Sequence, residues 1–517
     1  MVLSILRLGL IVALTATASC KSREVPALAP AQNNQLHAVA DFGVIADRAD
    51  RSRLSVAVPE SRQAPPGRLR AGAARVEITP NASDLATATD SIRDPLFARA
   101  VVIDDGVTCA VLVGLDLGGV TTATVTAATT TAAAAIDCPA ANFLISATHT
   151  HSSNTQGLGQ GPPLPQTVAD AIVQAATAAK SKLAPARVGY GTTQVDLNVN
   201  RDLYNGKFEW RQEPNPNGRS DKTLAVIEFL GADNVPIAVY MNYAMHPINF
   251  YLSGVISADF PGEASRYIED LFENRTIAVF TQGASGDQNP RDFRSPTTFM
   301  GQRAALAAGQ GPFVQTVGTP QAPETASAQG FNAQQASSER QAIPAASLDA
   351  YKRTIARTGD YVHMLGSMLG SSAVRLMRES ITPLETGRIW SAQETVSCPG
   401  RVRNDADNPA RENVFPGYKD GPDVTLKVGV LRIGEIAFAW VNGEAYSGIG
   451  MRLKAEAPLS KALMVTLANG SAGSGYIYSD DAYSHLTFQV IGSRLKPGCA
   501  ENKIVSTASN LMSRSER

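Results

Sequence analysis

Short apolar runs that end in small or polar residues recur along the chain, and runs of this length are typical of buried β-strands. The predicted strands are residues 69–78, 94–103, 108–117, 143–146, 187–197, 223–229, 235–241, 276–280, 425–433, 436–441 and 463–467. The Asp-Asp-Gly turn at residues 104–106 predicts a hairpin between the second and third of these strands.

Longer segments with apolar residues at helical spacing separate several of the predicted strands. The predicted helices are residues 121–136, 168–183, 262–272, 348–379 and 451–459. The order of residues 108–117, 121–136 and 143–146 is strand, helix, strand, which is typical of a crossover between parallel strands. The sequence therefore predicts an α/β fold with a mixed central β-sheet flanked by helices, and only a short end segment after Lys496.

The N-terminus has the pattern of an export signal. Arg7 precedes an apolar run at residues 8–14, and small residues then lead to Cys20, so residues 1–20 are predicted to be a signal peptide. Small residues before a cysteine also resemble a bacterial lipoprotein cleavage site, and both lipidation of Cys20 and plain cleavage remain open. We expect the protein to be secreted, periplasmic or anchored to the outer membrane of a bacterium.

Two segments have compositions that differ from the rest of the chain. Residues 21–66 show little apolar periodicity and are predicted to be a disordered leader or tether. Residues 302–346 are rich in Ala, Gln, Pro, Gly and Ser and are predicted to be a low-complexity insertion. The remainder, residues 67–517, is predicted to form a single catalytic domain that contains this insertion.

The charge balance and the cysteine content indicate which partners and which disulfide bonds to expect. The chain has 46 basic and 47 acidic residues, a balance that gives no support for a nucleic-acid partner. Beyond Cys20 there are four cysteines, and an exported protein can form disulfides. Cys398 and Cys499 lie in segments rich in Pro and Gly and are the first expected pair, whereas Cys109 can equally be a buried thiol in a strand.

The strongest chemical signal is a His-x-His pair directly after the predicted strand at residues 143–146. In an extended backbone, residues two positions apart share a face, so His149 and His151 are expected to lie side by side. Imidazole is a common ligand of catalytic transition metals, which predicts a zinc site at a strand end. The alternative is an ordinary polar loop.

Other predicted strands also end in candidate ligands. His246 follows residues 235–241, and Glu444 follows residues 436–441. His149, His246 and Glu444 would together supply two imidazoles and a carboxylate, a set typical of catalytic zinc, which lowers the pKa of water and polarises a carbonyl group. His151, beside the metal but not bound to it, would transfer a proton during amide or ester hydrolysis.

Several motifs in a fixed order carry a resemblance to a known family. They are AGAARVEITP at 71–80, DPLFARA at 94–100, SATHTHS at 146–152, NVNR at 198–201, NYAMHP at 242–247, GDQNP at 286–290, NGE at 442–444 and GY at 475–476. Over residues 71–493 the chain thus resembles the neutral/alkaline non-lysosomal ceramidases, zinc amidohydrolases that cleave N-acylsphingosine into sphingosine and a fatty acid.

The resemblance implies a set of site residues and a substrate class. It implies zinc (Zn2+) ligands at His149, His246, Glu444 and Tyr476, and catalytic roles for His151 and for Arg201, which would stabilise an oxyanion. It also implies a lipid or other N-acyl small molecule as substrate, with a membrane surface as a possible partner through Cys20. The residues that it places at the substrate are Asp287, Asn289 and Phe488.

The chain departs from the family pattern in three places. Asn289 stands where ceramidases carry a Ser, and Phe488 stands where they carry a second Tyr. The family's C-terminal β-sandwich has no expected counterpart in this sequence. These departures leave two alternatives to a ceramidase-like amidohydrolase: a zinc hydrolase of the same fold that acts on a different amide or ester, and a non-catalytic binding protein.

Overall fold

Two β-sheets form the centre of the fold in the computed structural model, which describes residues 67–153, 165–207, 209–251, 253–292, 343, 345–407, 410 and 412–517. The order in the larger sheet is β13 (Ile277–Gln282), β11 (Pro236–Tyr243), β10 (Thr223–Gly231), β7 (Ala184–Gln194), β2 (Arg70–Glu77), β4 (Phe97–Asp104), β5 (Cys109–Leu115) and β6 (Phe143–Ala147). The order in the smaller sheet is β16 (Ile389–Arg403), β17 (Tyr418–Ile433), β18 (Ile436–Val441) and β20 (Lys461–Val465).

The two sheets pack face to face through one shared apolar core. Leu112 and Tyr240 of the larger sheet and Leu431 and Phe438 of the smaller sheet are buried in it. The rings of Tyr240 and Phe438 meet edge to face at 5.2 Å. Because neighbouring residues of a strand face opposite sides, Val111 and Val113 point away from this core into a second one.

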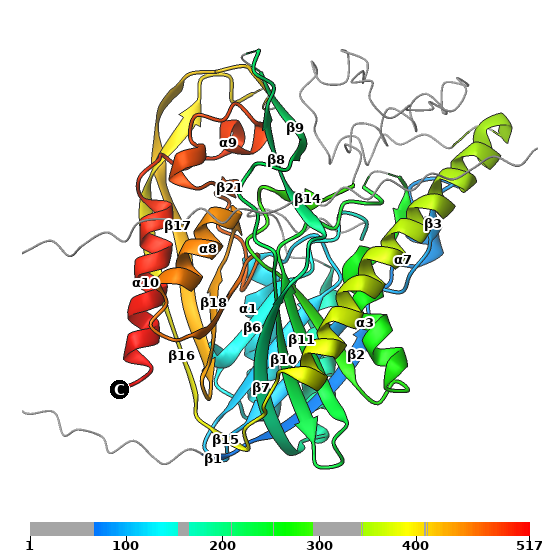
Figure 1. Cartoon of the computed structure of the whole chain (residues 1–517), viewed down its shortest axis with the longest axis vertical. Helices are drawn as coiled ribbons and strands as arrows, with labels where there is room; N and C mark the ends of the chain where they lie inside the picture. The colour runs from blue at the N-terminus through cyan, green and yellow to red at the C-terminus, as the bar shows by residue number, and fades with distance from the viewer. Residues whose placement is uncertain are drawn as a thin grey trace, which may run out of the picture. The chain divides into compact units, whose positions relative to one another are not determined.

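Helices cover the outer faces of both sheets (Figure 1). On the larger sheet, α1 (Thr122–Ile136) and α2 (Gln166–Ser181) cover one part and α3 (Asp259–Leu271) and α7 (Leu348–Glu379) another. On the smaller sheet, α8 (Ser447–Glu456) and α10 (Ala500–Arg514) complete the apolar core. The result is the predicted α/β fold, arranged as helix, sheet, sheet and helix layers.

Three crossover units supply the strand ends that matter for the site. They are β5–α1–β6, β11–α3–β13 and β18–α8–β20, and each joins two parallel neighbouring strands. The larger sheet curls so that β5 approaches β13, where a Cβ atom on Gly114 would lie 2.9 Å from the carbonyl oxygen of Phe280. This close approach brings the ends of strands far apart in the sheet order near one another.

Most of the predicted elements are present. The hairpin at the Asp-Asp-Gly turn is confirmed, with Asp104 paired to Cys109, and α7 spans the predicted residues 348–379. The predicted signal peptide at residues 1–20, the predicted leader at residues 21–66 and most of the predicted insertion at residues 302–346 lie outside the described residues.

Several parts of the fold differ from the prediction, and two of them are in the smaller sheet and the helices that cover it. The end segment after Lys496 contains α10, whose buried positions include Ile504, Ala508 and Leu511 at helical spacing among polar residues. In addition, β16 was not predicted, and β17 begins at Tyr418 rather than near residue 425. The outer halves of these two strands pair mainly with each other, so they lack the apolar runs that mark core strands.

All four cysteines beyond Cys20 form disulfides. Cys398 pairs with Cys499 as expected, with their Cα atoms 5.7 Å apart, and this bond joins β16 to the start of α10. Cys109 pairs with Cys138, so the buried-thiol alternative was wrong, because the end of α1 brings Cys138 beside β5. In the described part of the chain, every helix is too short or too polar to cross a membrane.

Candidate metal centre and catalytic site

A turn, rather than a strand, brings His149 and His151 together. The strand β6 ends at Ala147, and the backbone N–H of His149 then donates to the carbonyl of Leu117 at 2.9 Å. His149 has a φ of 70°, a left-handed conformation that is uncommon for a residue with a side chain. The expectation that strand alternation aligns the two imidazoles was therefore wrong, although the two side chains are neighbours.

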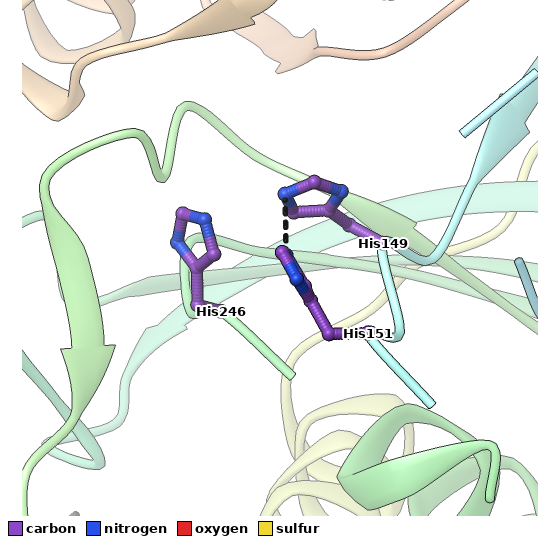
Figure 2. A group of neighbouring side chains, drawn as sticks. All are labelled: His149, His151 and His246. Atoms are coloured by element: carbon purple, nitrogen blue, oxygen red, sulfur yellow. Dashed lines mark hydrogen bonds between the residues drawn. The ribbon is translucent and has the colours of Figure 1, made fainter. Parts of the chain in front are cut away.

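Three imidazole rings lie close together in the site (Figure 2). The Nε2 atoms of His149 and His151 are 3.2 Å apart, and His246, which follows β11, completes the group. One ligand nitrogen from each of the three residues lies within 4.8 Å of the others. His149 and His246 are fully buried. The structure thus brings together all three histidines that the sequence singled out.

Backbone carbonyls fix the orientation of two of these rings. Nδ1 of His149 lies 2.6 Å from the carbonyl oxygen of Gly118, and Nδ1 of His246 lies 3.1 Å from that of Gln288. Because a carbonyl only accepts hydrogen bonds, each Nδ1 carries the proton, and each Nε2 presents a lone pair to the centre. Burial, and then the charge of Arg201, lowers the pKa of His246 to about 4, so this ring is neutral at pH 7.

Glu444 reaches the same point from the smaller sheet. Its Oε1 atom lies 2.7 Å from Nε2 of His246 and 3.4 Å from Nε2 of His149. A short strand, β19 (Glu444–Ala445), pairs in parallel with β21 (Tyr476–Ile477), and this register sets Tyr476 directly beside Glu444. In the sequence analysis, only the family resemblance predicted that Glu444 and Tyr476 lie together.

The donor set fits a divalent metal ion. Nε2 of His246 and Oε1 of Glu444 are both buried without a hydrogen-bond partner, although they face each other. Two acceptors so close together repel unless a cation or a proton lies between them. Two imidazole nitrogens and a carboxylate oxygen that leave room for water are the ligands typical of catalytic zinc. His149, His151 and His246 form a group that could hold such an ion, and Oε1 of Glu444 lies beside two of these rings.

Arg201 lies on the other side of Tyr476, on β8 (Asn198–Tyr204) at a break in the strand register. Its guanidinium is fully buried and donates to the Gly286 carbonyl at 2.5 Å, to the Tyr476 hydroxyl at 3.2 Å and to Oδ1 of Asn289 at 3.3 Å. The surface ion pair that is the usual environment of an arginine is excluded, because these partners are uncharged and buried. Arg201 is therefore held beside the candidate metal centre as a fixed donor.

Gln489 is a residue of the site that the sequence analysis did not identify. With its amide oxygen turned toward Arg201, it accepts from Nε at 2.9 Å and from Nη2 at 3.2 Å, and its amide nitrogen donates to Thr487. A buried guanidinium requires acceptors on every side, which is the signal that could have directed attention to a nearby Gln. Sequence spacing alone contains no such signal.

The three predicted substrate residues occupy different surroundings. Asn289, on β14 (Gln288–Pro290), contacts Arg201 directly. Phe488, in α9 (Phe488–Gly492), packs edge to face on Tyr476 with ring centroids 5.8 Å apart. Asp287 instead accepts from Ser447 at the start of α8 and from Asn200, and burial raises its pKa to about 6. Their substrate roles stay predictions.

Comparisons with known proteins agree with this architecture. Residues 81–380 match the family model of the neutral/alkaline non-lysosomal ceramidase N-terminal domain. The fold is similar to neutral ceramidase from Pseudomonas aeruginosa, with a TM-score of 0.61, 17% identity, and coverage of 86% of this chain and 75% of that one. It is also similar to a structure described as ceramidase complexed with C2, with a TM-score of 0.59, 16% identity, and coverage of 86% and 76%.

The fold and the site together define a class of protein, an α/β protein with a buried centre of histidines and a carboxylate at the ends of its strands. The family match covers more than half of the chain. The chain belongs to the neutral/alkaline non-lysosomal ceramidase family, a family of hydrolases that act on amide bonds.

Proposed function

We propose that the protein is a zinc-dependent amidohydrolase that cleaves the N-acyl amide bond of a ceramide-like lipid. The observation that carries the proposal is the convergence of buried, unpartnered acceptor atoms of His246 and Glu444 with Nε2 of His149. Membership of the ceramidase family and a similar structure whose description names a bound C2 compound support an N-acyl lipid as substrate.

His149, His246 and Glu444 would hold the metal ion, with Tyr476 as a further ligand that rests on the family resemblance. A bound zinc ion would supply Lewis-acid chemistry, lowering the pKa of a water molecule and polarising the substrate carbonyl. The chain's own contribution is to hold its ligands in place: backbone carbonyls fix the two imidazoles, and strand pairing fixes Glu444 beside Tyr476.

The remaining chemistry is a proton transfer and the stabilisation of charge. Hydrolysis adds water across the C–N bond, so a proton that water gives up must reach the leaving nitrogen. His151 would accept that proton on its imidazole ring and return it to the amine as the bond breaks, because burial and the neighbouring His149 and His246 keep its pKa well below the ordinary value and the ring therefore neutral. The guanidinium of Arg201 would stabilise negative charge on the carbonyl oxygen.

A second candidate is a hydrolase of the same fold for a different amide or ester. Phe488 contacts Tyr476 and Arg201 at the site but has no hydroxyl, and Asn289 uses its side-chain oxygen to accept from Arg201. A site without the second phenol loses one hydrogen bond to the substrate. This observation favours a substrate whose polar part differs from that of ceramide.

Export and domain organisation remain proposals of the sequence. We propose that residues 1–20 direct export, that Cys20 is an optional lipid anchor, and that residues 67–517 act as one catalytic domain. The described residues do not include the leader.

The test is to measure metal content and hydrolysis together. The purified protein is assayed on N-acylsphingosine and on short N-acyl and ester substrates, with and without a chelator. We expect about one zinc per chain and a chelator-sensitive amidase. His246→Ala should lose the metal and lower activity by more than about a hundredfold, because a ligand is removed.

His363→Ala is the matched control, because His363 is an exposed histidine on α7 that pairs with Glu263 and not with a candidate metal ligand. It should leave zinc content and activity unchanged. A metal-free protein with chelator-insensitive activity would refute the mechanism. Ester activity without amidase activity would support the second candidate, and zinc binding without any hydrolysis would support a binding protein.

A further inference from the structure

Exposed apolar side chains lie on three segments of the chain: the segment of Tyr204 and Trp210, the segment of Val414 and Phe415, and the segment of Tyr483. Tyr204, Val414, Phe415 and Tyr483 have 44%, 47%, 65% and 42% of their surface exposed. Together with the partly exposed Trp210 of β9 (Trp210–Asn215), we call them the aromatic rim. Water exposure of so many large apolar groups in one region is unfavourable unless the region has a partner.

Side-chain contacts connect one half of the aromatic rim. The rings of Tyr204 and Trp210 are 5.3 Å apart. Asn413, in a left-handed conformation with a φ of 61°, accepts from the backbone N–H of Trp210 at 2.5 Å and donates to its carbonyl at 2.8 Å. The backbone N–H of Asn413 also donates to Leu486 at 2.9 Å. One asparagine thus fastens all three segments together beside Val414 and Phe415.

The other half of the aromatic rim is connected through a buried arginine. Phe415 lies 5.6 Å from Tyr418, and the guanidinium of Arg401 stacks over Tyr418 at 4.0 Å and lies 5.4 Å from Tyr483. Arg401 also donates to the backbone carbonyls of Val490 and Ser493. The exposed side chains therefore belong to segments that contact one another, and not to independent loops.

The same segments carry the candidate catalytic residues. Arg201 lies on β8, the strand that ends at Tyr204, and Phe488 lies five positions after Tyr483. In Figure 1 the β8–β9 hairpin meets the connection between β16 and β17 at the end of the structure above β21. The aromatic rim thus shares its segments with Arg201 and Phe488.

We infer that the aromatic rim inserts into a lipid surface of zwitterionic headgroups, from which the substrate enters the site. This choice of partner rests on the proposed function, because a ceramide-like substrate resides in a lipid phase. Tyr and Trp favour the boundary between headgroups and acyl chains, and single apolar side chains projecting from turns can penetrate it. A flat contiguous patch would instead be typical of a protein interface.

The charges around the aromatic rim argue for apolar insertion rather than electrostatic attachment. On β9 and the turn before it, Arg211 is flanked by Glu209 and Glu213, and its guanidinium pairs with both. On the segment that carries Tyr483, Asp481 pairs with Arg219. A balanced surface gives little attraction to anionic lipids, so binding should depend weakly on salt and on anionic lipid content.

The experiment measures binding of the full chain to phosphatidylcholine vesicles by sedimentation, in a Cys20→Ser background so that no acyl chain contributes. The double variant Val414→Ser/Phe415→Ser should weaken vesicle binding by roughly tenfold or more, because two apolar side chains lose their transfer to lipid. Tyr483→Ser tests the same surface from another segment and should weaken binding by about threefold.

Val107→Ser is the matched control, because Val107 is 78% exposed in the β4–β5 hairpin. That hairpin binds Ile389 at the start of β16 through Asp105, whereas the aromatic rim adjoins the other end of this strand, on the order of 50 Å away. The control variant should bind like the parent protein.

Unchanged vesicle binding in both rim variants would overturn the inference, and so would binding that needs phosphatidylserine and disappears at high salt. Thermal unfolding shows whether each variant is folded. If the double variant is not folded, the vesicle binding of Tyr483→Ser decides the question. Because binding is measured without hydrolysis, an inactive protein that still needs the aromatic rim for vesicle binding would refute the proposed function alone.

Discussion

Arg201 is a buried cation whose hydrogen-bond partners are all neutral. Gly286, Asn289, Tyr476 and Gln489 accept from its N–H groups, and no carboxylate among the described residues forms an ion pair with it. Neutral acceptors orient a guanidinium without cancelling its charge. The positive charge therefore remains available to an oxyanion that develops during the reaction.

Replacing Gln489 tests this positioning role. Gln489→Leu removes the amide oxygen that accepts from both Nε and Nη2 of Arg201. We expect kcat to fall about 10–100-fold with KM changed little, because Arg201 acts mainly on charge that develops in the transition state. Gln489→Glu keeps an acceptor oxygen beside Arg201 but adds a negative charge that offsets the charge of the guanidinium, so it should also lower kcat. Equal kinetic constants in the Leu variant and the parent protein would contradict the role.

The sequence identified the ligand types at the site but not their conformations. His149, His246 and Glu444 were recognisable because each follows an apolar run that ends abruptly. The left-handed turn at His149 and the acceptor role of Gln489 depend on contacts with Leu117 and Arg201, which are distant in sequence. Local patterns carry no information about such contacts.

At the level of elements, one side chain links the two sheets below the site. After β20 the chain crosses to β6, where Asn469 accepts from the backbone N–H of Ile145 at 2.9 Å and donates to the carbonyl of Phe143 at 3.0 Å. Asn469 has a φ of 54°, which asparagine tolerates better than most residues. Its amide takes the place of a neighbouring strand on the edge of β6.

Asn469→Ala should lower the free energy of unfolding by about 2–4 kcal/mol, because it leaves two backbone groups of β6 without partners. Chemical denaturation measures the change. Asn234→Ala is the control, since Asn234 is also left-handed, with a φ of 62°, but lies in the β10–β11 turn. It should cost only about 1 kcal/mol. Equal losses in the two variants would show that the link between the sheets contributes nothing.

Elements with strong periodicity were predictable, and elements stabilised by their neighbours were not. The 32 residues of α7 repeat apolar positions along one face, and its predicted bounds are confirmed. In contrast, α10 is held by packing on β17 and α8 and by the Cys398–Cys499 disulfide at its start. Its polar composition hides the buried positions until the opposing surface is known.

At the scale of the whole molecule, the candidate metal centre draws its ligands from both sheets. His149 and His246 follow β6 and β11 of the larger sheet, whereas Glu444 follows β18 of the smaller sheet. A metal ion held by all three would therefore bind the folded arrangement and not the unfolded chain. Such binding stabilises the native state by mass action.

Metal removal should therefore destabilise the entire fold. We expect a chelator to lower the thermal midpoint of the parent protein by on the order of 5 °C, and zinc to restore it. Magnesium, which prefers oxygen ligands, should not. His246→Ala should unfold at the same temperature with and without zinc. A midpoint in the parent protein that does not respond to the chelator would contradict a metal shared by the two sheets.

The wide separation of the ligands along the chain also sets the order of events in biogenesis. A ribosome that has passed β11 by a few residues has made His149 and His246, but Glu444 and Tyr476 come only with the last strands. A nascent or truncated chain would offer two imidazoles without the carboxylate and would hold zinc weakly. Loading of the proposed metal would then follow synthesis, in whichever compartment the completed chain folds.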